Sequence, residues 1–383
     1  MLNTYSFLGI ALVVLAGAYL LAAIVSVLWF RARLRAAAMV TNLPVTVLKP
    51  LCGNEMDLEN NLRSFCQQDY ETFQVVFGVR DRQDPAVEIV NKIISEHGDL
   101  DISLVVNDRV VGSNLKISNL ANMMPAAKHD ILVIADSDMH VGTDYLKTVA
   151  APFADDAVGA ATCLYSGSGR GGIMSTLGAM FINDWFFPSA LIAAMRSELT
   201  FCFGATMAIR RNACLAFGGF EALSDVLADD YMLGNLVSKQ GLKVALVPYV
   251  VKNVVYEPNF RALFRHEVRW ARTIRNVKPF GYAMSTISEA LAVSIVAATL
   301  FHLADWPVWL VLSPIIAIAI LRLTLHMTVC GTIKGKGECV PWLIPLRDLL
   351  SVCIRMTAYC GSTVHWREQV LTVRANSRLQ DAS

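Results

Sequence analysis

The sequence predicts an α/β domain built on a mostly parallel β-sheet, with apolar helices before and after it. Short strands and helices alternate from Val45 onward, which is the pattern of βαβ units. The two ends of the chain are strongly apolar and raise the hydrophobic content to 55% and the mean hydropathy to +0.46. Several predicted strands end in charged side chains, which indicates a binding site at one edge of the sheet.

The first apolar run, Phe7 to Phe30, is uncharged and about long enough to cross a bilayer. Arg31, Arg33 and Arg35 follow it, so the positive-inside rule places this end in the cytoplasm and the N-terminus outside. A cleaved signal peptide would carry its basic residues before a shorter apolar core. We therefore expect residues 1–35 to form a retained transmembrane anchor.

Residues 41–282 are expected to form the cytoplasmic sheet domain. Strands are predicted at Val45–Leu48, Gln74–Val79, Ile102–Val106, Ile131–Ala135, Val158–Cys163, Ala205–Ile209 and Lys243–Val247, and helices at Leu58–Cys66 and Ala86–His97. Neither a G-x-G-x-x-G nor a G-x-x-x-x-G-K-[ST] motif is present, which argues against a dinucleotide-binding fold and a P-loop. A net charge of +1 without a basic, aromatic stripe gives no sign of nucleic-acid binding.

The predicted strand at 131–135 ends in two carboxylates, Asp136 and Asp138. Such a pair can share one divalent cation, or one acid can hold the metal while the other holds a sugar hydroxyl. Alternatively, Asp136 opens a turn and Asp138 caps the next element. Lys49-Pro50 and Asp81 end two other predicted strands, and convergence of these ends at one edge of a parallel sheet favours a nucleotide-type pocket.

Two further polar clusters lie between or after the strands. Lys116 is a candidate for neutralising a phosphate or a carboxylate, or else a solvated helix-surface lysine, and Asn119 would share its helical face. Asp229 and Asp230 open a predicted helix. Asp229 fits the role of helix cap and dipole partner, whereas Asp230 is the candidate general base.

The middle of the chain holds three less regular segments. Gly167–Gly172 is expected to be a flexible loop, either a lid or a linker. Ile173–Ala194 is apolar and aromatic but contains Asp184 and Pro188, so we expect amphipathic helices on the bilayer surface, with a buried core helix as the alternative. Phe201–Thr206 has the small residues of a strand that lets a substrate approach the backbone.

A very basic segment, Arg261 to Arg275, ends the sheet domain. Within it, His266, Arg269 and Trp270 could contact a substrate, because an arginine can hold a diphosphate through two hydrogen bonds and a tryptophan can pack against a ring. The alternative is a basic helix beside the membrane that contacts anionic lipid headgroups.

Residues 283–383 are expected to form a C-terminal membrane region and a basic tail. Met284–Leu303 and Trp306–Met327 can each span a bilayer, and Lys334 and Lys336 mark the loop Thr332–Glu338 as cytoplasmic. The hydrophobic segment Val340–Gly361 carries Arg347, Asp348 and Arg355, which are costly inside a membrane. We therefore expect a re-entrant or interfacial hairpin there and a cytoplasmic C-terminus.

The nine cysteines are scattered and form no C-x-x-C motif. This pattern favours reduced thiols in a reducing compartment rather than a disulfide or zinc framework.

Taken together, the ordered motifs resemble the membrane-bound ceramide glucosyltransferase family, which has the GT-A glycosyltransferase fold and includes bacterial enzymes that glycosylate hopanoids. The resemblance covers the chain from Val45 to the basic tail. It is carried by Lys49-Pro50-Leu51, Asp81 with Asp84-Pro85, Lys116-Ile117-Ser118-Asn119-Leu120, Asp136-Ser137-Asp138, Asp229-Asp230-Tyr231 and Arg269-Trp270. Two positions depart from the family pattern: His266 stands where Gln or Arg is usual, and Asn183–Pro188 lacks the His-Pro of the animal enzymes.

The resemblance implies a role for each matching residue. Asp81 would bind the uracil or ribose of a UDP-sugar, Asp136 and Asp138 would hold the diphosphate through Mg²⁺ or Mn²⁺, and Asp230 would deprotonate the acceptor hydroxyl. Arg269 and Trp270 would close over the diphosphate and the acceptor.

The expected function is transfer of a hexose, with inversion, from a UDP-sugar to the hydroxyl of a membrane lipid. UDP-glucose and a ceramide-like acceptor are favoured, in a multi-pass protein of the bacterial inner membrane whose catalytic domain is cytoplasmic. The alternative within this class is transfer of N-acetylglucosamine to a hopanoid polyol. A processive polysaccharide synthase would need more spans, and a transporter or membrane scaffold should carry its polar residues within the spans.

Overall fold

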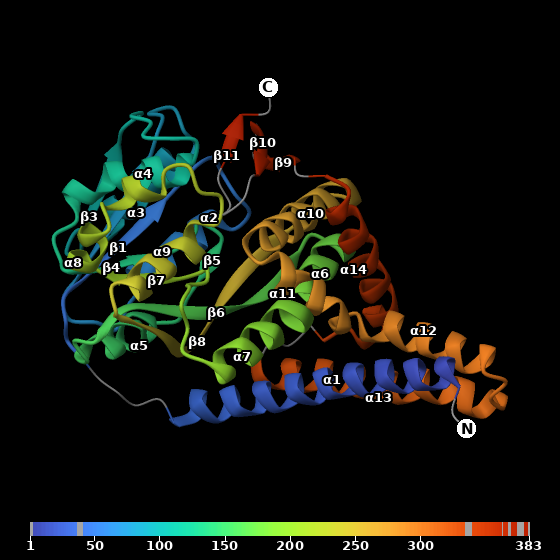
Figure 1. Cartoon of the computed structure of the whole chain (residues 1–383). Helices are drawn as coiled ribbons and strands as arrows, with labels where there is room; N and C mark the ends of the chain where they lie inside the picture. Colours follow the sequence, from blue (N-terminus) through green and yellow to red (C-terminus); the bar gives the residue numbers. More distant parts are fainter. Residues whose placement is uncertain are drawn as a thin grey trace. The chain divides into compact units, whose positions relative to one another are not determined.

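A computed structural model describes residues 3–36, 41–333, 339–361, 363–366, 369–373 and 379–381 (Figure 1). The chain divides into two compact units. The first comprises residues 1–32, 167–195 and 257–369, and the second comprises residues 33–166, 196–256 and 370–383. Residues 334–338 of the predicted loop Thr332–Glu338 and most of the basic tail lie outside the described residues, whereas Thr332 and Ile333 end α13.

The second unit contains an eight-stranded sheet in the order β3-β2-β1-β4-β7-β6-β8-β5. Its strands are β1 (Val45–Pro50), β2 (Phe73–Val79), β3 (Asp101–Val106), β4 (Ile131–Ile134), β5 (Met139–His140), β6 (Val158–Arg170), β7 (Met207–Arg210) and β8 (Lys243–Tyr256). Strands β3, β2, β1 and β4 are mutually parallel, with Leu48 opposite both Val76 and Ile134. The pairs β4–β7, β6–β7 and β5–β8 are antiparallel.

Helices connect and cover these strands. They are α2 (Leu58–Cys66), α3 (Ala86–Glu96), α4 (Leu115–Met123), η1 (Met124–Ala126), α5 (Tyr145–Ala150), η2 (Ala151–Ala154), α8 (Arg211–Ala216), η4 (Phe220–Leu223) and α9 (Asp229–Lys239). Alternate strand residues such as Val75, Phe77 and Val133 pack with α2, α3 and α5 in one buried core. This alternation places every second side chain of a strand on the same face.

Part of the second unit differs from the sequence-based expectation. Phe201–Thr206 is not a strand but a turn region with an isolated bridge between Phe203 and Thr206. Thr162 explains the difference, because its hydroxyl accepts a hydrogen bond from the amide of Phe203 at 2.8 Å and donates one to the carbonyl of Thr206 at 2.8 Å. The segment is thus curled around one side chain.

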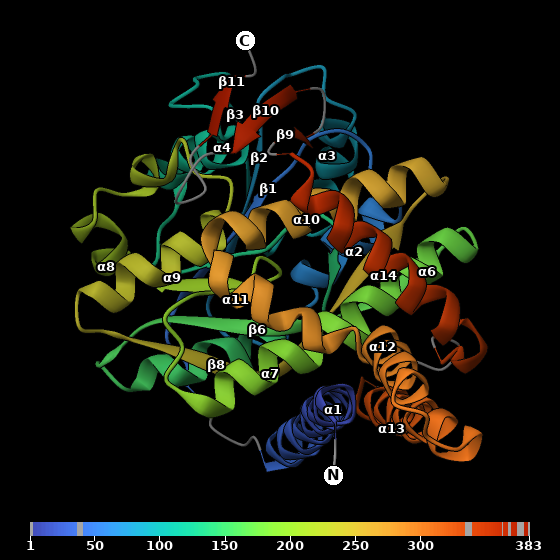
Figure 2. The same cartoon turned by 45° about the vertical axis from the view of Figure 1, so that its right-hand side comes forward.

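The first unit is helical. Its elements are α1 (Thr4–Ala36), α6 (Ile173–Phe181), η3 (Ile182–Phe186), α7 (Phe187–Arg196), α10 (Phe260–Val277), α11 (Pro279–Met284), η5 (Ser285–Ser288), α12 (Ala290–Leu303), α13 (Val308–Ile333), η6 (Pro341–Leu343) and α14 (Ile344–Tyr359). The tail carries β9 (Thr363–Trp366), β10 (Gln369–Val373) and β11 (Leu379–Asp381), of which β10 and β11 are antiparallel. In both views α12 and α13 lie side by side with α1 along them (Figures 1 and 2).

Three helical segments among the described residues are long and apolar enough to cross a membrane: Thr4–Ala36, Ile173–Arg196 and Val308–Ile333. The most apolar stretch of Ile173–Arg196 is 61% buried, against 22% for each of the other two, which favours the alternative of a buried core helix for this segment. The predicted span Met284–Leu303 contains a bend of 70° between Pro279–Ser288 and Ala290–Leu303, and these two segments together could form one broken span or a re-entrant loop.

Two further expectations for this unit are corrected. Gly167–Arg170 belongs to β6 rather than to a flexible loop, and Asn183 fixes Gly167 by bonding its amide at 2.8 Å and its carbonyl at 3.0 Å. Residues 344–359 form one continuous helix, α14, rather than a hairpin. Its charges are tolerated because Arg347 pairs with Glu267 at 2.7 Å and Arg355 pairs with Glu289 at 3.1 Å inside the protein.

Candidate active site

Asp136 and Asp138 follow β4, the last strand of the parallel half of the sheet, which pairs with β1 on one side and with antiparallel β7 on the other. Strand β1 lies beside β4, and its buried Lys49 donates a hydrogen bond to the backbone carbonyl of Asp136. Burial lowers the pKa of Lys49 to about 7, although the nearby Asp136 and Asp138 oppose this shift. The turn after β4 is therefore fixed by an amine from the neighbouring strand, as expected where parallel strands end together.

Asp138 is held by Asn253, which lies 115 positions later in the chain. The amide of Asn253, on β8, donates a hydrogen bond to Oδ2 of Asp138 at 2.8 Å. Burial, followed by the charges of Asp136 and Glu55, raises the pKa of Asp138 to about 7. A cation bound between these carboxylates would relieve that repulsion, so the chemistry of the donors fits a hard divalent ion such as Mg²⁺ or Mn²⁺.

Lys116 joins the two predicted acidic clusters. Its Nζ lies 2.6 Å from Oδ1 of Asp136 and 3.3 Å from Oδ2 of Asp229. Burial alone would lower the pKa of Lys116, but the charges of Asp136 and Asp229 outweigh it and raise the pKa above its usual value. Asp229 therefore does more than support the start of a helix, because it shares this lysine with the strand-end aspartate.

The loop before α4 explains why Lys116 points into this cluster. The side chain of Asn114 caps α4 by accepting a hydrogen bond from the amide of Ile117, and its Nδ2 donates to the carbonyl of Val226 at 2.8 Å. Gly112 lies so close to the same loop that a Cβ would fall 2.6 Å from the Cβ of Ser224. The start of α4 is thus fastened to the segment that leads into α9.

Asn119 has a structural task on the same helix. Its Nδ2 donates to the carbonyl of Gly78 at 2.8 Å, next to the end of β2. A side chain at Gly78 would lie 2.5 Å from Oδ1 of Asn119, so only glycine allows this close approach.

Asp230 faces the strand-end carboxylates across Gly204. A Cβ at Gly204 would lie 3.4 Å from Oδ2 of Asp230 and 3.6 Å from Oδ2 of Asp136, so both oxygens are directed at one point. The other oxygen of Asp230, Oδ1, accepts a hydrogen bond from the amide of Tyr231 at 2.7 Å. Burial, followed by the charge of Asp229, raises the pKa of Asp230 to about 7.

Asp81 lies at the same edge of the sheet but is exposed. It follows β2, whose Gly78 is paired with Pro50 at the end of β1, and its Oδ1 accepts a hydrogen bond from the amide of Gln83 at 2.9 Å. The neighbouring Asp84 joins the two loops by accepting hydrogen bonds from the amides of Gly53 and Ala86. Asp81 therefore lies exposed at the edge of the sheet, on a turn that these hydrogen bonds hold in place.

His266, Arg269 and Trp270 lie on α10 in the other unit. Nδ1 of His266 is 2.6 Å from Oε1 of Glu257, and burial lowers the pKa of His266 although this hydrogen bond opposes the shift. The rings of His266 and Trp270 are 4.4 Å apart, and Trp270 stacks on Phe181 at 5.7 Å. Thus Lys116, Asp136, Asp138 and Asp230 converge in the sheet unit, and His266 and Trp270 form an aromatic group within the helical unit.

Three residues of the acidic cluster were missed from the sequence as site residues: Lys49, Asn253 and Asp229. Lys49 did stand out as the end of a strand, but nothing in the local sequence around Asn253 links it to Asp138, 115 positions earlier.

The family model that matches is glycosyl transferase family 21, over residues 9–379. Among characterised relatives, ceramide glucosyltransferase 1 and ceramide glucosyltransferase 3 of Caenorhabditis elegans are 21% and 22% identical over 342 and 341 residues. These alignments cover 88% and 86% of this chain and 73% of each relative. Among solved structures, a mannosyltransferase from Pyrobaculum calidifontis in complex with GDP-Man and Mn²⁺ aligns with a TM-score of 0.49 and 20% identity, over 92% of this chain and 99% of that one. The family match confirms the predicted family, and the structure confirms the predicted α/β class with apolar helices near both ends of the chain.

Proposed function

The chain belongs to glycosyl transferase family 21 and is a glycosyltransferase, and on that basis we propose that it transfers glucose from UDP-glucose to the hydroxyl of a ceramide-like membrane lipid. One observation supports this most strongly: Asp136 and Asp230, 94 positions apart, direct carboxylate oxygens at one point above Gly204. The names of the relatives, both ceramide glucosyltransferases, support the choice of sugar and lipid.

The donor would lie along the ends of the parallel strands. Asp81, exposed beside β1 and β2, would accept hydrogen bonds from the uracil or the ribose. Lys116, between Asp136 and Asp229, would place a positive charge beside the diphosphate. Asp136 would then contact the donor through its second oxygen, Oδ2, since Oδ1 is held by the lysine.

Asp138 and Asp136 would hold a divalent cation, Mg²⁺ or Mn²⁺. Asn253 fixes one oxygen of Asp138 and leaves the other for a ligand. When bound, such an ion neutralises the negative charge that develops on the departing UDP. A protein acid on the leaving side is then unnecessary, so the chain needs only one base.

Asp230 would be that base. Its pKa of about 7 is close to neutral pH. At that pH much of Asp230 is charged, and the carboxylate is still basic enough to accept a proton. Oδ1 is held by the amide of Tyr231, so Oδ2 is the oxygen that would take the proton from the acceptor hydroxyl. A base on the acceptor side would let the acceptor oxygen displace UDP directly, with inversion at the anomeric carbon.

We also propose roles for three residues of α10. Arg269 would bind the diphosphate, and Trp270, held between the rings of His266 and Phe181, would pack against the acceptor. His266 would orient Trp270 rather than carry a charge, because its pKa is lowered by burial.

We further propose that the sheet domain, residues 41–282, lies in the cytoplasm, with residues 1–35 as its anchor and residues 283–383 as its C-terminal membrane region. The helices that could cross a membrane would place this domain at the inner leaflet of a bacterial inner membrane, where a lipid hydroxyl lies at headgroup level.

The test is a UDP-release assay on the full chain in lipid nanodiscs. UDP-glucose and UDP-N-acetylglucosamine are each combined with ceramide and with a hopanoid polyol, with and without EDTA. We expect release above background with UDP-glucose and ceramide, abolished by EDTA and restored by Mg²⁺ or Mn²⁺, and an α-to-β change at the anomeric carbon by NMR. Release only with the hopanoid polyol would overturn the acceptor, and retention of configuration would overturn the role of Asp230.

A further inference from the structure

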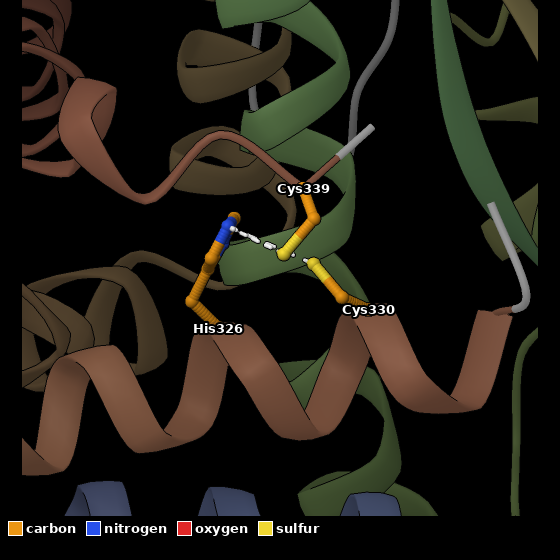
Figure 3. A group of neighbouring side chains, drawn as sticks. All are labelled: His326, Cys330 and Cys339. Atoms are coloured by element: carbon orange, nitrogen blue, oxygen red, sulfur yellow. Dashed lines mark hydrogen bonds between the residues drawn. The ribbon is translucent and has the colours of Figure 1, made fainter. Parts of the chain in front are cut away.

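The end of α13 and the segment after it bring together three side chains that are common metal ligands. His326 and Cys330 lie one turn apart on α13, and Cys339 comes from the segment that leads into α14. Nε2 of His326 lies 3.6 Å from Sγ of Cys330 and 3.6 Å from Sγ of Cys339. Figure 3 shows the three side chains pointing toward one another.

Hydrogen bonds can satisfy the two thiols without a metal, because Cys330 can donate to Nε2 of His326 and Cys339 donates to Sδ of Met327 at 3.6 Å. The separations between the three ligand atoms, however, also match those of a zinc site. A tetrahedral zinc ion with Zn–N of about 2.0–2.1 Å and Zn–S of about 2.3 Å requires N···S separations of about 3.6 Å. Both separations from His326 have this value, and the three ligand atoms all lie within 4.8 Å of one another.

The contacts of Nδ1, the other ring nitrogen of His326, independently indicate that this histidine binds a metal. Nδ1 lies 3.0 and 2.9 Å from the two carboxylate oxygens of Asp184, and the histidine is only 1% exposed. Asp184 is itself held by Arg322 at 3.2 Å. A carboxylate that accepts the Nδ1–H of a histidine fixes its tautomer and directs the Nε2 lone pair at the metal, which is the usual outer-shell arrangement of metal-binding histidines.

We propose that His326, Cys330 and Cys339 bind one zinc ion. One nitrogen and two sulfur ligands suit zinc rather than Mg²⁺ or Mn²⁺, which prefer oxygen. On binding, each thiol loses a proton to solvent, so two protons leave as one Zn²⁺ enters. The ion and the two thiolates then sum to zero charge, so the site adds no net charge beside the buried His326 and Asp184.

This zinc ion has a structural role that follows from its position. It would join the end of α13 to the start of the segment that leads into α14. Helix α14 in turn holds α10 through the ion pair of Arg347 with Glu267. The site is unrelated to the acidic cluster of the sheet unit, and its ligands escape a spacing search because the third lies nine residues beyond the second, on another element.

The first experiment measures bound metal in the full chain, purified in detergent without a metal-affinity step. Mass-spectrometric metal analysis should find about one zinc per chain, because the three ligands form a single site. The zinc content should fall at least about fivefold in each of three variants, because each removes one of the three ligands. These variants are Cys330→Ser, Cys339→Ser and His326→Gln. Cys353→Ser is the matched control, since it alters an exposed cysteine of α14, and should leave the zinc content unchanged.

The second experiment uses the unaltered chain, so it holds even if a variant fails to fold. A zinc chelator should make two further thiols reactive toward maleimide and lower the melting temperature, and added zinc should reverse both effects. A protein that binds no zinc, or binds it equally in the wild type and in all three ligand variants, overturns the proposal. A disulfide between Cys330 and Cys339 in the freshly purified chain overturns it as well.

Discussion

The two units of this chain treat buried charges in opposite ways. In the helical unit, Arg347 forms two hydrogen bonds of 2.7 Å with Glu267, and Arg355 and Arg322 are likewise paired with acids. In the sheet unit, Asp136, Asp138, Asp229 and Asp230 crowd together, and the pKa values of Asp138 and Asp230 are raised to about 7. Charges that stabilise a fold are matched with partners, whereas this excess of negative charge is suited to a cation and a proton from outside the chain.

The largest effect is expected from breaking a matched pair in the helical unit. Arg347→Met leaves Glu267 as an uncompensated buried charge, which costs about 3–5 kcal/mol. The melting temperature in detergent should fall sharply. The double variant Glu267→Gln with Arg347→Met should recover much of the loss, and an unchanged melting temperature in the single variant would show that the pair is not a stabilising element.

A pH profile tests the unmatched acids next. Asp230 is protonated below its pKa of about 7, so the base form is lost as the pH falls. With both substrates saturating, kcat should fall about thirtyfold from pH 8 to pH 5.5, because a base must be unprotonated to act. A rate that stays flat across this range would exclude Asp230 as the base.

A smaller effect is expected from the partner of Asp138. Asn253→Ala removes the 2.8 Å hydrogen bond that orients this carboxylate, and the concentration of Mn²⁺ needed for half-maximal rate should rise about tenfold. Lys252→Ala, one residue earlier on β8, serves as the control. Equal metal dependence in the two variants would contradict a metal-binding role for Asp138.

The smallest effect is expected from filling the space between Asp136 and Asp230. Gly204→Ala adds a methyl group in ordinary contact with Asp136 and Asp230, so the fold should tolerate it, but the methyl group occupies the point that both oxygens face. We expect kcat to fall about threefold to tenfold while the melting temperature stays within about 2 °C. Gly98→Ala, which adds a methyl group in open space, should change neither quantity.

The local parts of this structure could be predicted from sequence, and the contacts between distant parts could not. Helix Leu58–Cys66 matches its prediction end to end, and Asp136 and Asp138 follow a buried strand as expected. Hydrophobic period and strand-end chemistry are local signals. Asn253 beside Asp138, and Asp229 beside Lys116, depend on tertiary contacts between segments more than 100 residues apart.

The charged residues of α14 also show that contacts between distant parts of the chain cannot be predicted from local sequence. Arg347 and Arg355 looked too costly for a continuous apolar helix, so a hairpin was expected. Glu267 and Glu289, on other elements, remove that cost. A sequence pattern shows a charge but not its partner.

We infer that Asp230 serves catalysis at the expense of stability, and the variant Asp230→Asn tests this inference directly. A raised pKa stabilises the fold at acid pH, and this contribution is lost as the pH rises through about 7, so at pH 8 the wild type carries the full penalty. An asparagine side chain cannot ionise, and its oxygen can still accept a hydrogen bond from the amide of Tyr231. In this variant we expect UDP release with saturating lipid to fall at least about a thousandfold, while the melting temperature at pH 8 rises by about 2–4 °C. Asp156→Asn, at an exposed acid of the same unit, should change neither quantity. Unchanged UDP release, or a lower melting temperature at pH 8, would contradict it.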